Sequence, residues 1–139
     1  MDRQRTPSAE KGPGRSQRRL RVLAVDDDPA LRRFYAALLN EEGHEVALAA
    51  NGAEALAHLD WLPDLILLDL MMPVMDGYEF LRRLRQTPRG RDVPVLVLSA
   101  AIAPGRRTVP GAQAYLRKPF DFGTLVRTLE ALGPPRPAH

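Results

Sequence analysis

The sequence predicts an α/β domain built around a parallel β-sheet. Four short apolar runs, each bounded by polar or turn-forming residues, have the length and character of strands that are buried on both faces of a sheet. Segments with apolar residues at helical spacing separate the runs, and this alternation is typical of βαβ units. The runs cover residues 22–25, 65–68, 95–98 and 114–116, and a further edge strand is expected at residues 45–49.

Composition limits the class of protein. The chain of 139 residues has the size of one domain, and its hydrophobic content of 45% is enough for a core. The absence of cysteine excludes disulfides and thiolate chemistry and favours a cytoplasmic setting. No apolar stretch approaches the roughly 18 residues of a membrane span. No apolar segment follows the N-terminal arginines, which argues against a signal peptide.

The positive charge belongs to an N-terminal tail. Residues 1–21 hold seven basic and two acidic residues, a net charge of +5, so residues 22–139 sum to −2 against +3 for the whole chain. Residues 1–18 are polar and rich in arginine and should be disordered, as should residues 134–139, which leaves a domain at 19–133. The tail has no aromatic residue on which a base could stack, so nucleic-acid binding is not expected.

The first helix should follow the first strand directly. Asp28 is a suitable N-cap, and Pro29 suits the first helical position. Gly43 should end the helix. The apolar residues between these signals fall on one stripe that should face the core, and they are Leu31, Phe34, Tyr35, Leu38 and Leu39.

Two further helices lie in the middle of the chain. Asn51 and Glu54 have the spacing of a capping box, which predicts a second helix. Gly77 precedes a third helix with two distinct faces. Its apolar face should consist of Phe80, Leu81 and Leu84, and its solvent face of Arg82, Arg83 and Arg85.

The segment between the fourth and fifth strands lacks the usual helix signals. Pro104, Gly105, Pro110 and Gly111 interrupt residues 100–111 and leave only four residues between the breakers. A helix needs about 12 residues to sustain itself, so we expect a loop with at most one helical turn. The final helix follows the fifth strand and should bury Phe122, Leu125, Val126 and Leu129.

Polar side chains stand at the ends of the predicted strands. In open α/β sheets ligands bind beyond the carboxyl ends of the strands, so these side chains should meet in one crevice. Carboxylates suit Mg²⁺, whereas a lysine and a hydroxyl suit a phosphoryl group. Together they predict a site that places phosphate on an aspartate, formed by Asp26, Asp27, Asp69, Ser99 and Lys118.

The order and spacing of these residues resemble the receiver domain of two-component response regulators, the CheY-like family. The segment Pro63–Gly77, PDLILLDLMMPVMDG, is very similar to the phosphorylation-site motif of that family, and the resemblance covers residues 20–132. It implies a flavodoxin-like, doubly wound, five-stranded parallel sheet in the order 2-1-3-4-5. The family's fourth helix would here be shortened or absent.

The resemblance implies that Asp69 is the phosphoacceptor. Mg²⁺ would be bound by Asp27, by Asp69 and by the backbone carbonyl of Met71, with Asp26 acting through a water. Crowding of three carboxylates should also raise at least one of their pKa values unless a cation binds. In the family, positions equivalent to Met71 and Ala101 flank the approach of a hydrolytic water, so phosphorylated Asp69 should be long-lived here.

The resemblance also assigns residues to the phosphoryl group and to the response. Ser99, the backbone N–H of Ala100 and Lys118 would bind the phosphoryl oxygens. Ser99 and Tyr115 would form the switch. We further expect a cis Lys118–Pro119 bond, because the lysine must turn back into the crevice.

The function implied is that of a single-domain response regulator, not an enzyme, although it assists its own phosphorylation and dephosphorylation. A sensor histidine kinase or a phosphotransfer protein would supply the phosphoryl group. The face beside residues 100–111 would contact an unidentified target or a second copy of the chain. No second domain is expected after residue 133, which disfavours a transcription factor.

Two other functions are alternatives to that of a phosphorylatable receiver. A pseudo-receiver would bind proteins without using phosphate, but all five expected side chains are present. A phosphatase of the haloacid-dehalogenase type would carry a second acid where this chain has Met71. His44 and His58 lie away from the crevice and should be surface residues, not phosphorelay histidines or ligands.

Overall fold

The computed structural model describes residues 19–72, 74–100 and 109–133. Five parallel strands form one sheet in the order β2-β1-β3-β4-β5, as predicted. The strand bounds agree with the predicted ones to within one residue at every end. The strands are β1 (Arg21–Val25), β2 (Glu45–Ala49), β3 (Leu65–Leu68), β4 (Val95–Ser99) and β5 (Ala114–Arg117).

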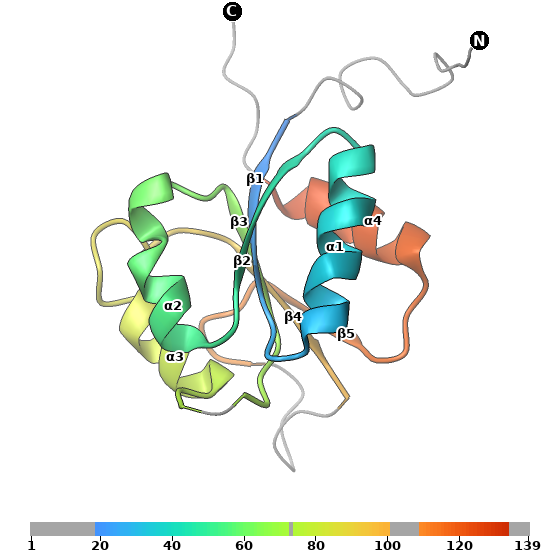
Figure 1. Ribbon diagram of the computed structural model, residues 1–139. Coiled ribbons are helices and arrows are strands. Elements are labelled where there is room, and N and C mark those ends of the chain that lie inside the picture. The colour runs from blue at the N-terminus through green and yellow to red at the C-terminus, as the bar shows by residue number, and fades with distance from the viewer. Residues whose placement is uncertain (1–18, 73, 101–108, 134–139) are drawn as a thin grey trace, which may run out of the picture.

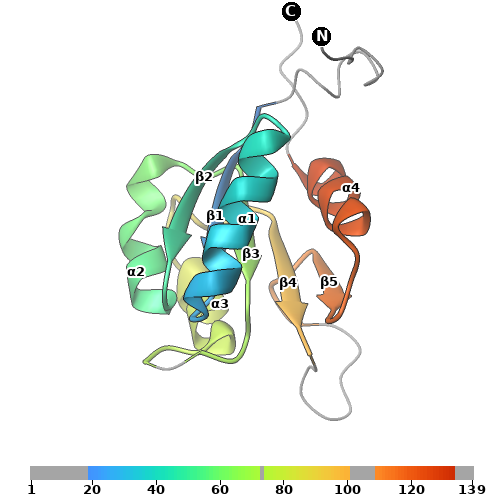
Figure 2. The same ribbon diagram turned by 45° about the vertical axis from the view of Figure 1, so that its right-hand side comes forward.

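Helices cover both faces of the sheet (Figures 1 and 2). On one face lie α1 (Pro29–Glu41) and α4 (Phe122–Leu132). On the other lie α2 (Gly52–Ala57), which continues into a short 3₁₀-helix, η1 (Leu59–Trp61), and α3 (Gly77–Leu84). Among the described residues, no helix is long and apolar enough to span a membrane.

The expected loop between β4 and β5 falls mainly on residues 101–108, which lie outside the described residues. The described residues on either side of this gap, Ala100 and 109–113, form bends and turns and contain no helix.

The core consists of two apolar layers, one on each face of the sheet. Alternate residues of a strand point to opposite faces. Val22 and Ala24 of β1 therefore pack beneath α1 and α4, whereas Leu23 and Val25 pack beneath α2 and α3. Every residue of β3 and β4 is buried, which explains why these strands read as uninterrupted apolar runs.

Local capping signals work as predicted. The Asp28 carboxylate accepts hydrogen bonds from two backbone N–H groups in the first turn of α1. Asn51 caps α2 by accepting a bond from the N–H of Glu54. The return bond of this capping box is displaced by one residue, because Glu54 accepts from the N–H of Ala50. Gly43, with φ of +95°, follows the end of α1.

Arg85 was expected to face solvent but is half-buried. Helix α3 ends one residue earlier, so Arg85 caps it and turns back toward the loop that follows. Its guanidinium donates hydrogen bonds to the backbone carbonyls of Gly90 and Val93. It also donates to the carbonyl of Gly111 and to the side chain of Gln113. Arg85 thereby joins the loop before β4 to the segment before β5.

The prediction that His44 lies on the surface is also wrong. Its exposure is only 2%, because α4 packs over the turn between α1 and β2. Nδ1 accepts a hydrogen bond from the N–H of Leu20 at 3.2 Å, so the ring carries its proton on Nε2. Nε2 lies 3.1 Å from Oε2 of Glu130 and donates to it. His44 thus joins the residue before β1 to the last helix, whereas His58 is partly exposed at the end of α2.

Candidate functional site

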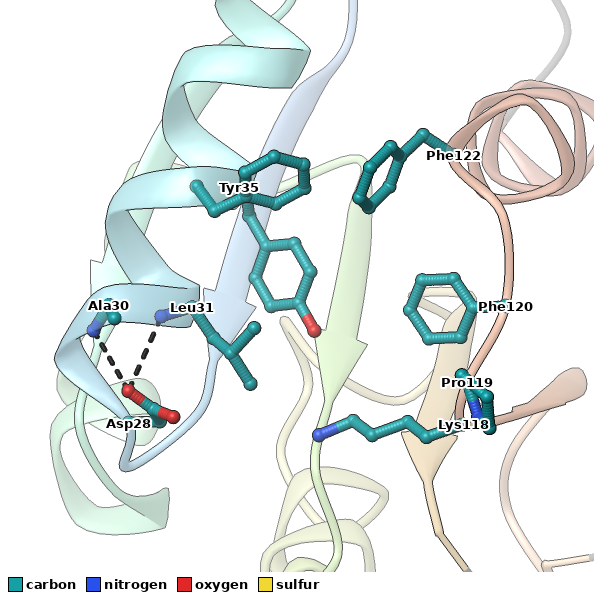
Figure 3. A pocket seen from close by; sticks show the side chains of 9 residues that line it. Asp28, Ala30, Leu31, Tyr35, Lys118, Pro119, Phe120 and Phe122 are labelled. Atoms are coloured by element: carbon teal, nitrogen blue, oxygen red, sulfur yellow. Dashed lines mark hydrogen bonds between the residues drawn. The ribbon is translucent and has the colours of Figure 1, made fainter.

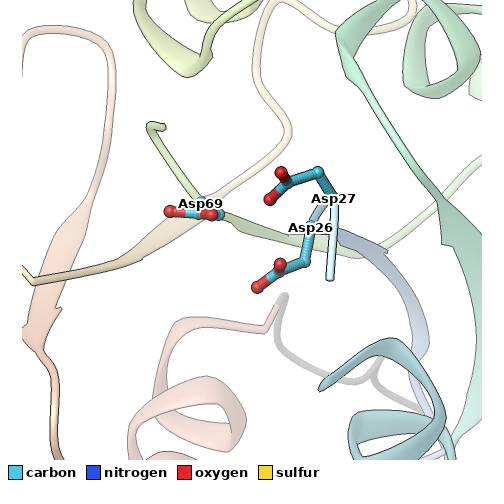
Figure 4. Close-up of side chains that lie close together, drawn as sticks. All are labelled: Asp26, Asp27 and Asp69. Carbon is cyan, nitrogen blue, oxygen red and sulfur yellow. The ribbon is translucent and has the colours of Figure 1, made fainter. Parts of the chain in front are cut away.

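Three aspartates meet at the carboxyl ends of β1 and β3 (Figure 4). Val25 and Leu68 are partners in the sheet, so the next residues, Asp26 and Asp69, leave it side by side. Asp27 follows Asp26 and completes the group. One carboxylate oxygen from each aspartate lies within 4.8 Å of the other two. Asp26 and Asp69 are buried and Asp27 is exposed, so the acidic cluster opens to solvent on one side.

The two carboxylate oxygens of Asp26 have different surroundings. Oδ1 accepts a hydrogen bond of 2.9 Å from the N–H of Asp28. Oδ2 is buried and has no hydrogen-bond partner among the described residues. The ammonium of Lys118 lies 3.6 Å from Oδ2, beyond normal hydrogen-bond length. Burial is the main reason why the pKa of Asp26 is raised, and the charge of Lys118 opposes the rise.

The pKa of Asp69 is also raised, for similar reasons. Its Oδ1 accepts a bond of 3.3 Å from the N–H of Met71. Burial again raises the pKa most, Lys118 lowers it, and the charges of Asp26 and Asp27 raise it further. The predicted rise in pKa is therefore present. Its largest cause is burial, however, and not the crowding of carboxylates from which it was predicted.

The remaining predicted site residues come from β4, β5 and the residues that follow them. Ser99 is fully buried at the end of β4, and its carbonyl accepts a bond of 2.9 Å from the N–H of Lys118. The Tyr115 hydroxyl donates to the same carbonyl at 3.4 Å. Ala100 is exposed at the edge of the crevice. The Lys118–Pro119 bond is cis, as predicted.

The donor set fits a small hard cation. Mg²⁺ prefers carboxylate oxygens together with waters, and three carboxylates offer oxygens close together here. Lys118 offsets only one of their three charges. In addition, the buried Oδ2 of Asp26 can still accept a hydrogen bond from a water in a cation's hydration shell. The residues present therefore fit Mg²⁺.

A groove of about 500 Å³ lies beside the acidic cluster, between the start of α1 and the segment that joins β5 to α4 (Figure 3). Its walls are largely apolar and include Leu31, Phe34 and Phe120. Phe122 was predicted to be buried but is 48% exposed, because it begins α4 at the open end of the groove. Its ring packs on Phe34 with centroids 4.4 Å apart.

Tyr35 is the residue of this region that sequence reasoning did not identify. It was predicted only as one member of the apolar stripe of α1, and it is indeed buried. Its hydroxyl, however, points toward the end of Lys118 in the groove (Figure 3). The sequence holds no signal for this, because a tyrosine at a core position looks the same whichever way its hydroxyl points.

Comparisons with known proteins agree with this architecture. The family model of the response regulator receiver domain matches residues 22–130. Response regulator MprA of Mycobacterium leprae (strain TN) is 43% identical over 117 residues, which cover 81% of this chain and 50% of MprA. MprA of Mycobacterium avium (strain 104) is 42% identical with the same coverage. The chain thus spans about half the length of the curated relatives it matches.

Solved structures give the same result. The chemotaxis protein CheY4 of Vibrio cholerae is similar with a TM-score of 0.76 and 36% identity, over 83% of this chain and 99% of that chain. The receiver domain of sensor histidine kinase PA1611 from Pseudomonas aeruginosa PAO1 has a TM-score of 0.75 and 34% identity, over 83% and 98%. That structure contains a magnesium ion coordinated in its active-site cleft.

Proposed function

Because this chain belongs to the response regulator receiver domain family, we propose that it accepts a phosphoryl group on Asp69 and signals by changing a protein–protein contact. The meeting of Asp26, Asp27 and Asp69 with Lys118 at one edge of the sheet carries the proposal. The phosphoryl donor would be a sensor histidine kinase or a phosphotransfer protein. The receiver would then bind a downstream protein or a second copy of itself.

The transfer needs an oxygen of Asp69 placed in line with the donor's phosphorus. As the new P–O bond forms, the bond between phosphorus and the imidazole nitrogen breaks, and its electron pair leaves with the imidazole. The N–H of Met71 holds Oδ1 of Asp69 and so fixes the orientation of the carboxylate. Positioning of this kind supplies much of the catalysis in phosphoryl transfer.

Charge on the phosphoryl oxygens must be offset during the transfer. Lys118, Ser99 and the N–H of Ala100 are the groups of this chain that we assign to those oxygens. Mg²⁺, held by Asp27, Asp69 and the Met71 carbonyl with Asp26 acting through a water, would supply further positive charge.

The response would start at Ser99. Its backbone carbonyl accepts hydrogen bonds from both Tyr115 and Lys118. A shift of Ser99 toward the phosphoryl group would therefore disturb the bond to Tyr115, whose ring is half-buried beside the α2–α3 layer. We infer that this pair forms the switch.

Replacement of Asp69 tests the acceptor. Wild-type protein should take up phosphate from a small acyl phosphate in the presence of Mg²⁺, and Asp69→Asn should take up none. The bound phosphate should be stable to acid and labile to base. Asp60→Asn is a matched control, because its side chain is 89% exposed on η1 and is not part of the acidic cluster.

Two outcomes would contradict the proposal. Uptake by Asp69→Asn at the wild-type rate would mean that another residue is the acceptor. No uptake by wild-type protein, from the acyl phosphate or from a phosphorylated kinase, would favour a binding module that does not use phosphate.

A further inference from the structure

Two buried polar atoms beside the acidic cluster have no hydrogen-bond partner among the described residues. They are the hydroxyl oxygen of Tyr35 and Oδ2 of Asp26. Both residues are only 2% exposed. A buried polar atom without a partner costs free energy, and such atoms are rare in folded proteins. Each of the two atoms therefore lowers the stability of the folded protein unless another group forms a hydrogen bond with it.

The two atoms are chemically complementary. Oδ2 of the Asp26 carboxylate can only accept a hydrogen bond, whereas the Tyr35 hydroxyl can donate one. Burial, followed by the charges of Asp26 and Asp69, raises the pKa of this hydroxyl, so it keeps its proton at neutral pH. That both charges act on the hydroxyl also shows that it lies within electrostatic reach of the acidic cluster.

Lys118 is a neighbour of both atoms. Tyr35 and Lys118 both line the groove, and the Tyr35 hydroxyl points toward the Lys118 ammonium (Figure 3). Lys118 in turn faces Oδ2 of Asp26 at 3.6 Å. One water that joined these three groups would have three polar partners, which is the usual number for a buried water.

We propose that Tyr35 is a positioning residue of the phosphorylation site, which holds Asp26 through a bridging water. Asp28 fixes one oxygen of the Asp26 carboxylate through its N–H. Tyr35 would fix the other oxygen, so that the carboxylate has a single orientation toward the hydration shell of Mg²⁺. The inference rests on the proposed function, because it assumes that Asp26 acts next to this cation.

Tyr35→Phe removes only the hydroxyl and leaves the ring in the core. Its dissociation constant for Mg²⁺, measured by calorimetry on the phosphate-free protein, should rise about tenfold, the low end of the effect of losing an outer-shell partner of a metal site. Tyr78→Phe makes the same change on α3, at a tyrosine that belongs to neither the acidic cluster nor the groove, and should bind Mg²⁺ like wild type. Equal affinities of Tyr35→Phe and wild type would overturn the inference.

Thermal unfolding without Mg²⁺ separates positioning from a merely structural role. Loss of packing alone would lower the midpoint of Tyr35→Phe and leave its Mg²⁺ affinity unchanged, which would refute the inference. The positioning role requires weaker Mg²⁺ binding in a variant that is still cooperatively folded at the temperature of the titration, because loss of the bridge changes the orientation of Asp26 and leaves the ring in the core.

A measurement on the wild-type protein covers the case in which the variant does not fold. With ¹³C at Cζ of every tyrosine, addition of Mg²⁺ should shift the Tyr35 resonance and leave that of Tyr78 in place. A Tyr35 resonance that stays in place while Mg²⁺ binds would reject the inference. The Mg²⁺ titration and the ¹³C measurement do not involve phosphate. Failure of phosphate uptake at Asp69 would therefore be distinguished from failure of the inference about Tyr35.

Discussion

Val74 has an unfavourable backbone conformation in the segment between Asp69 and α3. Its φ is 71°, in the left-handed region that β-branched residues avoid. The side chain is 84% exposed, so packing does not compensate for the strain. Val74 therefore holds backbone strain five residues after the proposed acceptor in the chain, and functional sites often hold such strain.

Val74→Gly should stabilise the protein. Relief of the left-handed strain is worth about 1–2 kcal/mol, partly offset by the greater freedom of glycine in the unfolded chain, so we expect a net gain of about 1 kcal/mol. Urea unfolding measures the gain. Val74→Ala keeps a Cβ and should gain less. A lower unfolding midpoint for Val74→Gly than for wild type would contradict this interpretation.

Met71 should control how long phosphate stays on Asp69. Its side chain is 70% exposed beside the acceptor and cannot orient an attacking water through a hydrogen bond. Met71→Asn should speed phosphate loss severalfold, because an amide can place water in line with phosphorus. Release of phosphate from the phosphorylated protein measures the rate. Val74→Asn, in the same loop, is the control, and equal rates for Met71→Asn and wild type would exclude the role.

At the scale of elements, Arg85 links the loop before β4 to the segment before β5. Its guanidinium satisfies backbone carbonyls of both loops, including Gly90, Val93 and Gly111. The Gln113 oxygen that Arg85 contacts also accepts a bond from the N–H of Val95, at the start of β4. The position of β5, which leads to Lys118, therefore depends on a side chain from the end of α3.

Arg85→Met should lower the free energy of unfolding by about 2 kcal/mol, because several half-buried carbonyls lose a charged donor. Arg82→Met removes an exposed arginine that pairs with Glu79 on the surface of α3 and should cost less than about 0.5 kcal/mol. Amide exchange at residues 109–113 should also become faster in Arg85→Met. Equal losses for the two variants would show that Arg85 has no special role.

At the scale of the whole molecule, the acidic cluster should make stability depend on pH. Burial raises the pKa values of Asp26 and Asp69 above the ordinary 3.8. The folded state thus binds these protons more tightly than the unfolded state does. Binding of these protons stabilises the folded state fully below pH 3.8. This stabilisation is lost as the pH rises through the folded-state pKa values of the two aspartates.

Without Mg²⁺, Asp69→Asn should therefore become more stable relative to wild type as the pH rises from about 4 to 7. Unfolding midpoints of both proteins across this range measure the difference, with Asp60→Asn as the exposed control. Saturating Mg²⁺ should reduce the advantage of Asp69→Asn, because the cation stabilises the wild-type cluster by binding to it. A difference that stays constant with pH would contradict the raised pKa of Asp69.

The sequence by itself determined the strands, the helix caps and the order of the site residues. These features depend on local chemistry: apolar runs form buried strands, and Asp28 and Asn51 cap the helices that follow them. Because parallel strands end at the same edge of a sheet, the residues after each run could also be placed together. The proximity of Asp26 to Asp69 follows from the sequence in this way.

Only the tertiary structure decided the partners of Arg85 and His44 and the surroundings of the Tyr35 hydroxyl. Each is a polar side chain on or beside a helix whose contact comes from an element distant in the chain. Arg85 meets Gly111 and His44 meets Glu130. Periodicity states which face of a helix is apolar, but it does not state where a polar atom at the edge of that face finds its partner. That is set by how the helices pack on the sheet.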